Sequence, residues 1–315
     1  METTLAYPIT NTQHPPLLAA VGSTPLLPID RIAAAEGISP AVRILAKAEW
    51  FNPGGSIKDR PARRILLTAL ENGLLDGKRL LDSTSGNMGI AYATLAPVLS
   101  VAVTLTVPEN ASPERLKILR LLGAEIILTD PLEGSDGAIL AARELAGADP
   151  ARYYYADQYN NPANWKAHYE TTGPEILADT NGELTHFVAG LGTTGTLVGT
   201  GRYLREHAPG ARLVAFQPDS PFHGLEGLKH MESAIVPGIY DPDLADENRS
   251  VRTEDAHEMT RRLAREEGLF AGISSGAALV AALAVARDLD QGVVVTVFPD
   301  AGYKYLTDRL WEVTG

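Results

Sequence analysis

The chain has 315 residues, and its 45% apolar and 21% charged content is that of an ordinary soluble protein with a sizeable core. Acidic residues outnumber basic ones by 39 to 27, and the net charge of -12 argues against binding to nucleic acid or to an anionic membrane. Because cysteine is absent, disulfides, thiolate nucleophiles and thiolate-bound metals are excluded. Residues 1–16 lack both a basic region and an apolar run, so we expect no secretion signal and a cytoplasmic protein.

An uncharged segment between Gly86 and Val107 is long enough to suggest a membrane span. Pro97 and Ser100 divide this segment into a helical pattern and a run of β-branched residues. The division favours a buried α/β core over a membrane helix.

Strand and helix patterns alternate along most of the chain, which predicts parallel βαβ units with helices on both faces of each sheet. A tyrosine-rich stretch at 153–165 interrupts the alternation and is a candidate crossing between domains. We therefore expect an α/β protein of two lobes, residues 47–160 and residues 1–46 with 161–315. Each lobe would be a mostly parallel twisted sheet flanked by helices, with the site in the cleft at the carboxyl ends of the strands. The patterns predict an extended piece within 22–27, strands at 42–49, 79–83, 101–107, 124–130, 185–190, 212–216 and 292–298, helices at 61–70, 112–123, 135–147, 253–268 and 275–289 and after Gly86 and Gly195, and a polar loop at 217–252.

The sequence NPGGSIKDR at 52–60 is typical of a turn that leads into a helix. Ser56 is expected to cap this helix, which places Lys58 in its first turn. The unpaired N–H groups there create a positive potential, so the lysine has a reason to lose its proton. A neutral lysine amine is what Schiff-base chemistry with a carbonyl cofactor needs. The alternative is a solvated lysine paired with Asp59, which this motif alone favours.

A glycine-rich turn, GLGTTG at 190–195, follows a predicted strand and opens a predicted helix. One interpretation is a dinucleotide fingerprint, but the next strand ends at Gln217 rather than at the acidic residue that such a site needs. The other is a cup for a phosphate monoester, formed by backbone N–H groups and the hydroxyls of Thr193, Thr194 and Thr196. We favour the monoester over the dinucleotide, and either anion over a turn without a ligand.

Two further strand-to-helix loops carry polar side chains. GISSG at 272–276 matches a nucleophile elbow, but a hydrolase of that fold places its histidine after the serine, and the last histidine here is His257. Ser274 is then a hydroxyl that can bond a ligand in the cleft, or a plain helix cap. STSGNMG at 83–89 combines hydroxyls, the Asn87 amide and exposed N–H groups in a nest suited to a carboxylate. The seven histidines are scattered, and no metal site is predicted.

Four loops thus supply a lysine, a carboxylate nest, a phosphate cup and a serine. Pyridoxal phosphate uses all four, because its aldehyde suits the lysine, its phosphate the cup, and its ring nitrogen the serine. The carboxylate of an amino-acid substrate suits the nest. A nicotinamide dinucleotide would leave the lysine and the nest unexplained.

The chain resembles the cysteine synthases, which are pyridoxal-phosphate enzymes of fold type II, with the fold of the tryptophan synthase β-subunit. The resemblance extends from GSTPLL at 22–27 to DAGYKYL at 300–306, and it rests on the ordered motifs NPGGSIKDR, TSGN, QYNNPAN, HYETTGPEI, GTTGT and GISSG. It is closest to the cysteine synthase B branch, where the cup has the sequence GTTGT. The resemblance implies β-replacement on an activated serine through an aminoacrylate intermediate, to which a sulfur nucleophile adds to give L-cysteine.

The resemblance also implies roles for single residues. Lys58 would hold the cofactor as an internal aldimine and act as the base at the substrate Cα, and Ser274 would face the pyridine nitrogen. The chain departs from the family at Met88, where threonine is usual; a thioether cannot donate a hydrogen bond, so only the backbone N–H would serve the substrate. Asn87 would bond the cofactor's 3-hydroxyl, Gly192, Thr193, Thr194, Gly195 and Thr196 would bind its phosphate, and Thr84, Ser85 and Gln158 would take the substrate carboxylate.

The leaving group is open between O-acetylserine and O-phosphoserine. Family members that prefer the phosphate are similar in carrying a basic residue in the loop that corresponds to 223–231, and Lys229 stands there where arginine is commoner. A lysine would hold a phosphate as a point charge without a bidentate fork. The alternatives are a solvated surface lysine at this position, or a role for the neighbouring cation His230.

Two other functions stay open at this point. A serine or threonine dehydratase on the same fold would use water after elimination, although QYNNPAN and the short chain without a regulatory domain count against it. A nicotinamide oxidoreductase that uses GLGTTG is the alternative from a different class. We expect a homodimer that binds small-molecule substrates. The sulfur donor is open between sulfide, thiosulfate and the thiocarboxylate of a sulfur-carrier protein.

Overall fold

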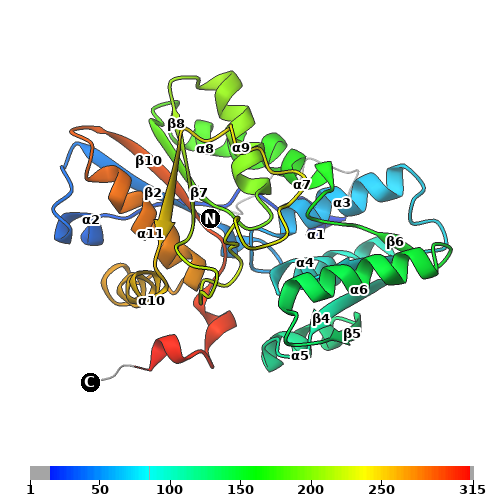
Figure 1. Ribbon diagram of the computed structural model, residues 1–315. Coiled ribbons are helices and arrows are strands. Elements are labelled where there is room, and N and C mark those ends of the chain that lie inside the picture. Colours follow the sequence, from blue (N-terminus) through cyan, green and yellow to red (C-terminus); the bar gives the residue numbers. More distant parts are fainter. Residues whose placement is uncertain (1–14, 85, 313–315) are drawn as a thin grey trace, which may run out of the picture.

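Two β-sheets divide the chain into two lobes in a computed structural model that describes residues 15–84 and 86–312 (Figure 1). The strands in the described residues are β1 (Leu26–Pro28), β2 (Val42–Ala48), β3 (Arg79–Ser83), β4 (Val103–Pro108), β5 (Glu125–Thr129), β6 (Tyr153–Tyr155), β7 (His186–Gly190), β8 (Arg212–Pro218), β9 (Glu247–Val251) and β10 (Gly292–Phe298). The larger sheet has the order β1-β2-β10-β7-β8-β9, and the smaller has the order β5-β4-β3-β6. Every pair of neighbours is parallel except β1 and β2, which confirms the expected class of two mostly parallel α/β lobes.

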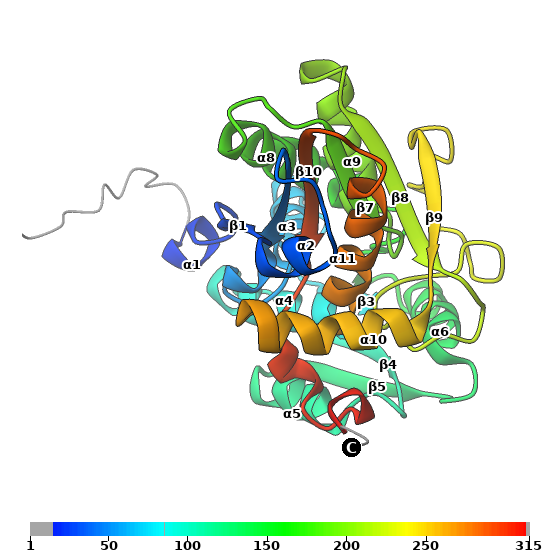
Figure 2. The ribbon, with the colours of Figure 1, turned by 90° about the vertical axis from the view of Figure 1, so that its left-hand side faces the viewer.

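Helices cover both faces of each sheet, as Figures 1 and 2 show from two sides. On the larger sheet, α10 and α11 cover one face and α8 and α9 the other, while α6 covers one face of the smaller sheet and α3, α4 and α5 the other. Within the described residues the helices are α1 (Pro16–Ala19), α2 (Arg31–Ala35), α3 (Asp59–Glu71), α4 (Asn87–Leu95), α5 (Pro113–Leu121), α6 (Gly134–Ala148), α7 (Pro162–Ala167), α8 (Gly173–Asp179), α9 (Gly195–His207), α10 (Thr253–Arg262) and α11 (Ile273–Ala286). None of these helices is long and apolar enough to cross a membrane.

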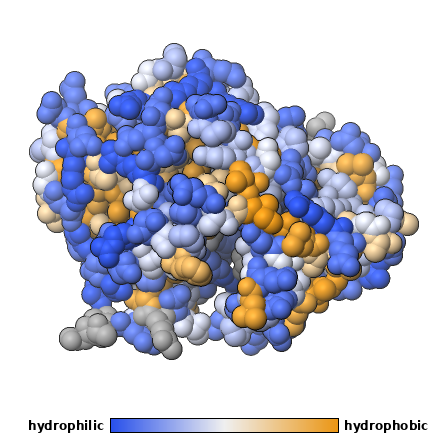
Figure 3. Space-filling view, in the orientation of Figure 1, coloured by the Kyte–Doolittle hydropathy of each residue, from blue (hydrophilic) through white to orange (hydrophobic). Residues whose placement is uncertain are grey.

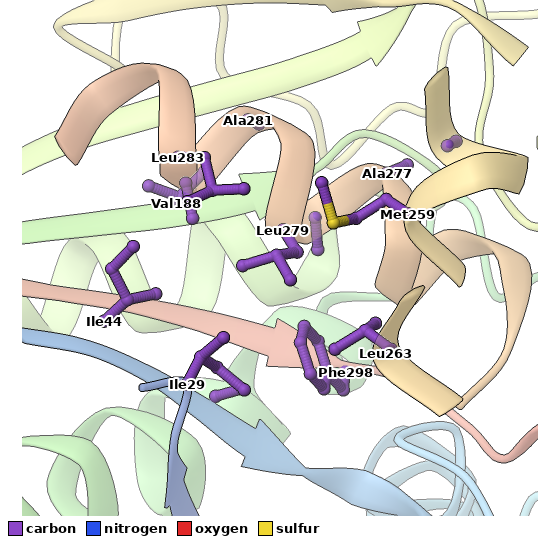
Figure 4. Close-up of a cluster of buried hydrophobic side chains, with 14 of the residues drawn as sticks. Ile29, Ile44, Val188, Met259, Leu263, Ala277, Leu279, Ala281, Leu283 and Phe298 are labelled. Atoms are coloured by element: carbon purple, nitrogen blue, oxygen red, sulfur yellow. The ribbon is translucent and has the colours of Figure 1, made fainter. Parts of the chain in front are cut away.

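The central strand β10 shows why a run of valines forms a strand here. Val294 and Phe298 belong to the buried cluster that includes the apolar residues of α11, part of which, with Phe298, is labelled in Figure 4. Val293 and Val295 belong to the cluster on the opposite face. Side chains alternate across a strand, so a strand covered on both faces needs apolar residues at every position. Burial of each such side chain contributes about 1.5–3 kcal/mol relative to exposure. The strand is therefore held in register, with its carboxyl end at the cleft.

The structure differs from the sequence prediction in several elements. The stretch at 153–165, predicted to interrupt the alternation, contributes β6 to the smaller sheet and begins α7, and α1, α2 and α8 were not predicted. The predicted polar loop at 217–252 contains the edge strand β9, which was missed because its residues alternate between partly buried and exposed and only Val251 is apolar. The predicted helix at 253–268 is α-helical only to Arg262 and continues as a π-helical turn, Leu263–Glu267. The predicted lobe boundaries, 47–160 against the remainder, stay a prediction.

Candidate active site

A cavity lies between the two sheets, at the ends of the strands where the sequence analysis expected a site. Thr84 follows β3, Gly192 follows β7, and Pro299 follows β10, and all three line the cavity. Gly195 begins α9 beside the lining residues, and Ser85 lies outside the described residues. The sequence-predicted residues that line the cavity are Lys58, Thr84, Asn87, Met88, Gln158, Gly192, Thr193, Thr194, Thr196, Lys229 and Ser274.

Lys58 stands one residue before α3 rather than in its first turn. The helix begins at Asp59, and the Ser56 hydroxyl accepts a hydrogen bond from the Lys58 N–H at 3.2 Å instead of capping a later residue. Within the described residues, the Lys58 amine makes no hydrogen bond or ion pair. Burial lowers its pKa, and Lys304 lowers it further, while Asp300 and Glu49 act in the opposite direction. The side chain is thus an amine that faces the cavity and is disfavoured as a cation.

The alternative pairing of Lys58 with Asp59 is wrong. Asp59 is fully buried, and its carboxylate accepts a hydrogen bond from the Gly54 N–H. Burial raises the pKa of Asp59 to about 7. The Asp59 side chain therefore lies buried against the Gly54 turn, whereas the Lys58 side chain lines the cavity.

The GLGTTG turn forms a cup at the amino end of α9. Thr194 takes a left-handed backbone conformation with φ of 67°, and its hydroxyl is buried without a hydrogen-bond partner among the described residues, although the residue is only 2% exposed. A Cβ atom at Gly192 would overlap the carbonyl oxygen of Gly227, so this turn needs glycine. A buried hydroxyl without a partner beside free helix N–H groups fits a phosphate with several acceptor oxygens.

The nest around α4 has its hydroxyl and amides already oriented. The Thr84 hydroxyl accepts hydrogen bonds from Gly86 N at 3.1 Å and Gly89 N at 3.2 Å, so its own proton is left to donate. The Gln158 amide donates to Ser83 O at 2.7 Å. Met88 is the second residue of α4 and packs its thioether into the core of the smaller lobe. Its backbone N–H lies in the first helical turn, where N–H groups lack helical partners.

Ser274 is the second residue of α11, and Gly272 occupies the cap position. The alternative that Ser274 is a plain helix cap is therefore wrong. Its hydroxyl makes no hydrogen bond within the described residues and lines the cavity. It is thus accessible to a hydrogen-bonding ligand.

Two cations in the cavity wall pair with acids of the opposite lobe. Lys229, which is 8% exposed, donates to Asp136 of α6 at 3.1 Å. Arg115 of α5 makes a bidentate pair with Glu226, with 2.9 Å between Nη2 and Oε2, and lies over the Tyr305 ring. The alternative that Lys229 is a solvated surface residue is wrong. His230 is not among the residues that line the cavity and lies near the Ser233 hydroxyl.

Sequence reasoning predicted Asn87 but not its partners Asp300 and Lys304, nor Asp136 and Glu226. Asn87 donates to Asp300 at 2.7 Å and accepts from Lys304 at 2.7 Å. Asp136 and Glu226 neutralise the two cations described above. The motif DAGYKYL contains Asp300 and Lys304, and the loop at 223–231 contains Glu226, but none of these residues had an assigned role.

Comparisons with known proteins agree with this geometry. Residues 17–300 match the family model described as pyridoxal-phosphate dependent enzyme. The chain is 53% identical to a cysteine synthase of Aquifex aeolicus, over 94% of this chain and 92% of that protein. It is 38% identical to cysteine synthase B of Pseudomonas aeruginosa, over 95% and 98%. The crystal structure of a cysteine synthase from Entamoeba histolytica superposes with a TM-score of 0.91 at 32% identity, covering 100% of this chain and 95% of that one.

The family assignment decides between the functions that the sequence left open. The nicotinamide interpretation of GLGTTG is set aside, because the matching family uses pyridoxal phosphate, and none of these findings favours the dehydratase. The resemblance to the cysteine synthases and the expected cofactor are confirmed. The chain belongs to the pyridoxal-phosphate-dependent enzymes and, within them, to the cysteine synthases.

Proposed function

We propose that Lys58 binds pyridoxal phosphate covalently and that the cup from Gly192 to Thr196 holds its phosphate. The observation that carries this proposal is the juxtaposition, in one cavity, of an amine without a partner and a buried Thr194 hydroxyl without a partner. Ser274 would face the ring nitrogen and Asn87 the 3-hydroxyl. Support comes from the Ser274 hydroxyl, which makes no hydrogen bond within the described residues.

The bound cofactor supplies an electron sink for a negative charge that develops on the substrate Cα. The proposed base is the Lys58 amine, which takes the Cα proton once substrate has bound. Its lowered pKa supports this role, because a base must be neutral at the working pH. The Thr84 hydroxyl, the Gln158 amide, the Met88 N–H and Ser85 would hold the substrate carboxylate, which fixes Cα near Lys58.

For the activated serine, we propose an uncharged β-substituent, as in O-acetylserine. Both cations in the cavity wall already have an anionic partner, Lys229 in Asp136 and Arg115 in Glu226. A phosphate would have to compete with these carboxylates for its counter-charges. O-phosphoserine is the second candidate, because Lys229 does line the cavity and would lie within reach of a β-substituent.

The binding proposal is tested by reducing the loaded enzyme with borohydride and mapping the modified peptide. We expect the adduct on Lys58, and loss of the visible absorption band in a Lys58→Ala variant. An adduct on another lysine would overturn the assignment of the cofactor lysine. The substrate proposal is tested separately, by comparing kcat/KM for O-acetylserine and O-phosphoserine with sulfide as the donor.

We also propose that the enzyme is a cytoplasmic homodimer. Support for self-association comes from apolar side chains that gather on the part of the face in Figure 3 formed by the smaller lobe, whose exposed residues include Leu121, Leu128 and Leu140. Light scattering at several protein concentrations would measure the mass. A sulfur-carrier protein stays a candidate partner, and assays with sulfide, thiosulfate and a carrier thiocarboxylate would rank the donors.

A further inference from the structure

The segment that follows β10 joins three of the loops around the cavity. Pro299 O accepts from Ile57 N at 2.9 Å, and Asp300 O accepts from Gly272 N at 3.0 Å. The Lys304 ammonium donates to Gly54 O at 3.1 Å. The segment therefore contacts the turn that carries Lys58 and the turn that carries Ser274.

The same segment also contacts the third loop, which precedes α4, through hydrogen bonds to the side chain of Asn87. The Asn87 Nδ2 atom donates to Asp300 Oδ2 at 2.7 Å, and the Lys304 Nζ atom donates to Asn87 Oδ1 at 2.7 Å. Within the described residues, Lys304 and Asp300 form no direct salt bridge. The neutral amide of Asn87 is thus the link between a cation and an anion.

This arrangement permits only one orientation of the amide. A carboxylate accepts hydrogen bonds and an ammonium group donates them. Turning the amide by 180° would put its N–H groups against the Lys304 ammonium and its oxygen against the Asp300 carboxylate. Two attractive contacts would become two repulsive ones, so the flipped state is strongly disfavoured.

Both charges are buried, which strengthens their hold on the amide. Asp300 is 0% exposed and Lys304 is 7% exposed, and the Tyr305 hydroxyl donates to the same Asp300 oxygen at 2.8 Å. Hydrogen bonds to charged groups are stronger than those between neutral groups, and they gain further in a low dielectric. One N–H of Asn87 is used by Asp300, and the second is left for the cavity that Asn87 lines.

We propose that Asp300 and Lys304 are positioning residues that lock the Asn87 amide with its second N–H directed to the cofactor. The inference rests on the proposed contact between Asn87 and the cofactor's 3-oxygen. Neither residue needs to touch the substrate or the cofactor. Apart from the Lys304 contact with Gly54 and the influence of both residues on the Lys58 pKa, the effect that we assign to them passes through Asn87.

A double-mutant cycle tests this dependence, with the dissociation constant of pyridoxal phosphate measured by titrating the apoenzyme. Asn87→Ala is expected to weaken cofactor binding about tenfold, and Lys304→Met about threefold to tenfold. Because Lys304 acts through Asn87, Lys304→Met is expected to add less than about twofold in the Asn87→Ala background. The visible absorption maximum should shift in the same direction in both single variants and no further in the double variant.

The controls separate this proposal from others. Lys117→Met removes a lysine charge from an exposed site on α5 and should leave cofactor affinity unchanged. Asp300→Asn provides a second route to the same test if Lys304→Met does not fold. Effects of Lys304→Met and Asn87→Ala that multiply in the double variant would overturn the positioning role while leaving the Asn87 contact intact. Unchanged cofactor affinity and spectrum in Asn87→Ala would instead overturn the contact itself, and the positioning role with it.

Discussion

The ammonium group of Lys229 lies 3.1 Å from the Oδ1 atom of Asp136, and this pair joins the two lobes across the cavity. The same ammonium lies 5.0 Å from the centre of the Tyr159 ring. Arg115 and Glu226 make a second pair in the opposite sense, with the cation on the smaller lobe. Each cation of the cavity wall is therefore neutralised by an acid from the lobe it faces.

This relationship predicts how Asp136 affects substrate choice. In Asp136→Asn the Lys229 charge loses its counter-ion and becomes available to an anionic β-substituent. We expect the ratio of kcat/KM for O-phosphoserine to that for O-acetylserine to rise about tenfold, since a charge-assisted contact is gained by one substrate only. Initial rates with both substrates at one ionic strength measure the ratio.

Lys229 supplies the control for this prediction. Adding Lys229→Ala to Asp136→Asn should abolish the gain, because no cation is left to bind the phosphate. If the ratio is unchanged in Asp136→Asn, the ion pair does not screen Lys229 from substrate. If Lys229→Ala alone lowers kcat/KM equally for the two substrates, Lys229 has a structural role only.

Binding of the cofactor phosphate in the cup is predicted to depend on the Thr194 hydroxyl. Thr194→Val keeps the shape of the side chain and removes the buried hydroxyl that has no partner among the described residues. Loss of a hydrogen bond to a charged phosphate should weaken cofactor binding by about 1.5–3 kcal/mol, or roughly tenfold to a hundredfold. Equilibrium titration of apoenzyme with pyridoxal phosphate measures this change.

Thr200 of α9, the helix that Thr194 precedes, offers a matched control. Its hydroxyl is also buried and makes no hydrogen bond within the described residues, but Thr200 is not among the residues that line the cavity. Thr200→Val should leave cofactor affinity unchanged. Equal losses in the two variants would show that packing of α9, rather than a hydroxyl contact, controls cofactor binding.

The candidate site could be predicted from sequence where one short motif carries both the turn and the polar group. NPGGSIKDR and GLGTTG combine glycines with a functional side chain, so their loops and their places at strand ends were correctly expected. The exact cap of the helix was not, because Ser56 bonds the Lys58 N–H and delays the helix to Asp59. Local propensity does not decide between caps that are two residues apart.

Contacts between polar side chains that are distant in the sequence could not be predicted. Lys229 and Asp136 are separated by 93 residues, and Asn87 and Asp300 by 213. A single charged residue in a helix or loop has no periodicity that reports its partner, so only the folded arrangement pairs them. The strand β9 was missed for a related reason, since an edge strand with one apolar residue resembles a polar loop.

A buried ion cluster beside the Lys58 turn is predicted to stabilise the fold. The Arg60 guanidinium bonds Glu49 at 2.8 Å and Glu175 at 2.7 Å, and both Arg60 and Glu49 are buried. Arg60→Met leaves the Glu49 carboxylate buried without its counter-charge, which should lower the free energy of unfolding by about 3–5 kcal/mol. Urea denaturation of the apoenzyme measures the change.

Two further variants make this prediction specific. Adding Glu49→Gln to Arg60→Met should recover part of the loss, because the uncompensated charge is removed. Arg252→Met breaks a pair with Glu254 that is exposed on both sides and should change stability by no more than about 1 kcal/mol. A small effect of Arg60→Met would mean that water reaches the Glu49 carboxylate.

The last prediction concerns the pH dependence of stability that arises from Asp82. This residue of β3 is fully buried, accepts from the Tyr92 hydroxyl at 3.0 Å and from Ser83 N at 2.9 Å, and has its pKa raised by burial to about 7. An unfolded chain releases this proton near pH 4. Between about pH 4 and pH 7 the folded state therefore holds more protons than the unfolded state, and the stability contributed by Asp82 falls as pH rises.

Asp82→Asn should remove this fall, since asparagine does not titrate and resembles the protonated carboxyl in shape. We expect the free energy of unfolding of Asp82→Asn, relative to the parent, to rise between pH 5 and pH 8, by at most about 4 kcal/mol. Chemical denaturation of both apoproteins across this range gives the difference directly, because the other titrating groups are common to the two. A constant difference between the curves would mean that Asp82 has a similar pKa in the folded and unfolded states. A difference that falls with pH would mean that the folded state prefers the Asp82 carboxylate, with its charge held by the Ser83 N–H and the Tyr92 hydroxyl.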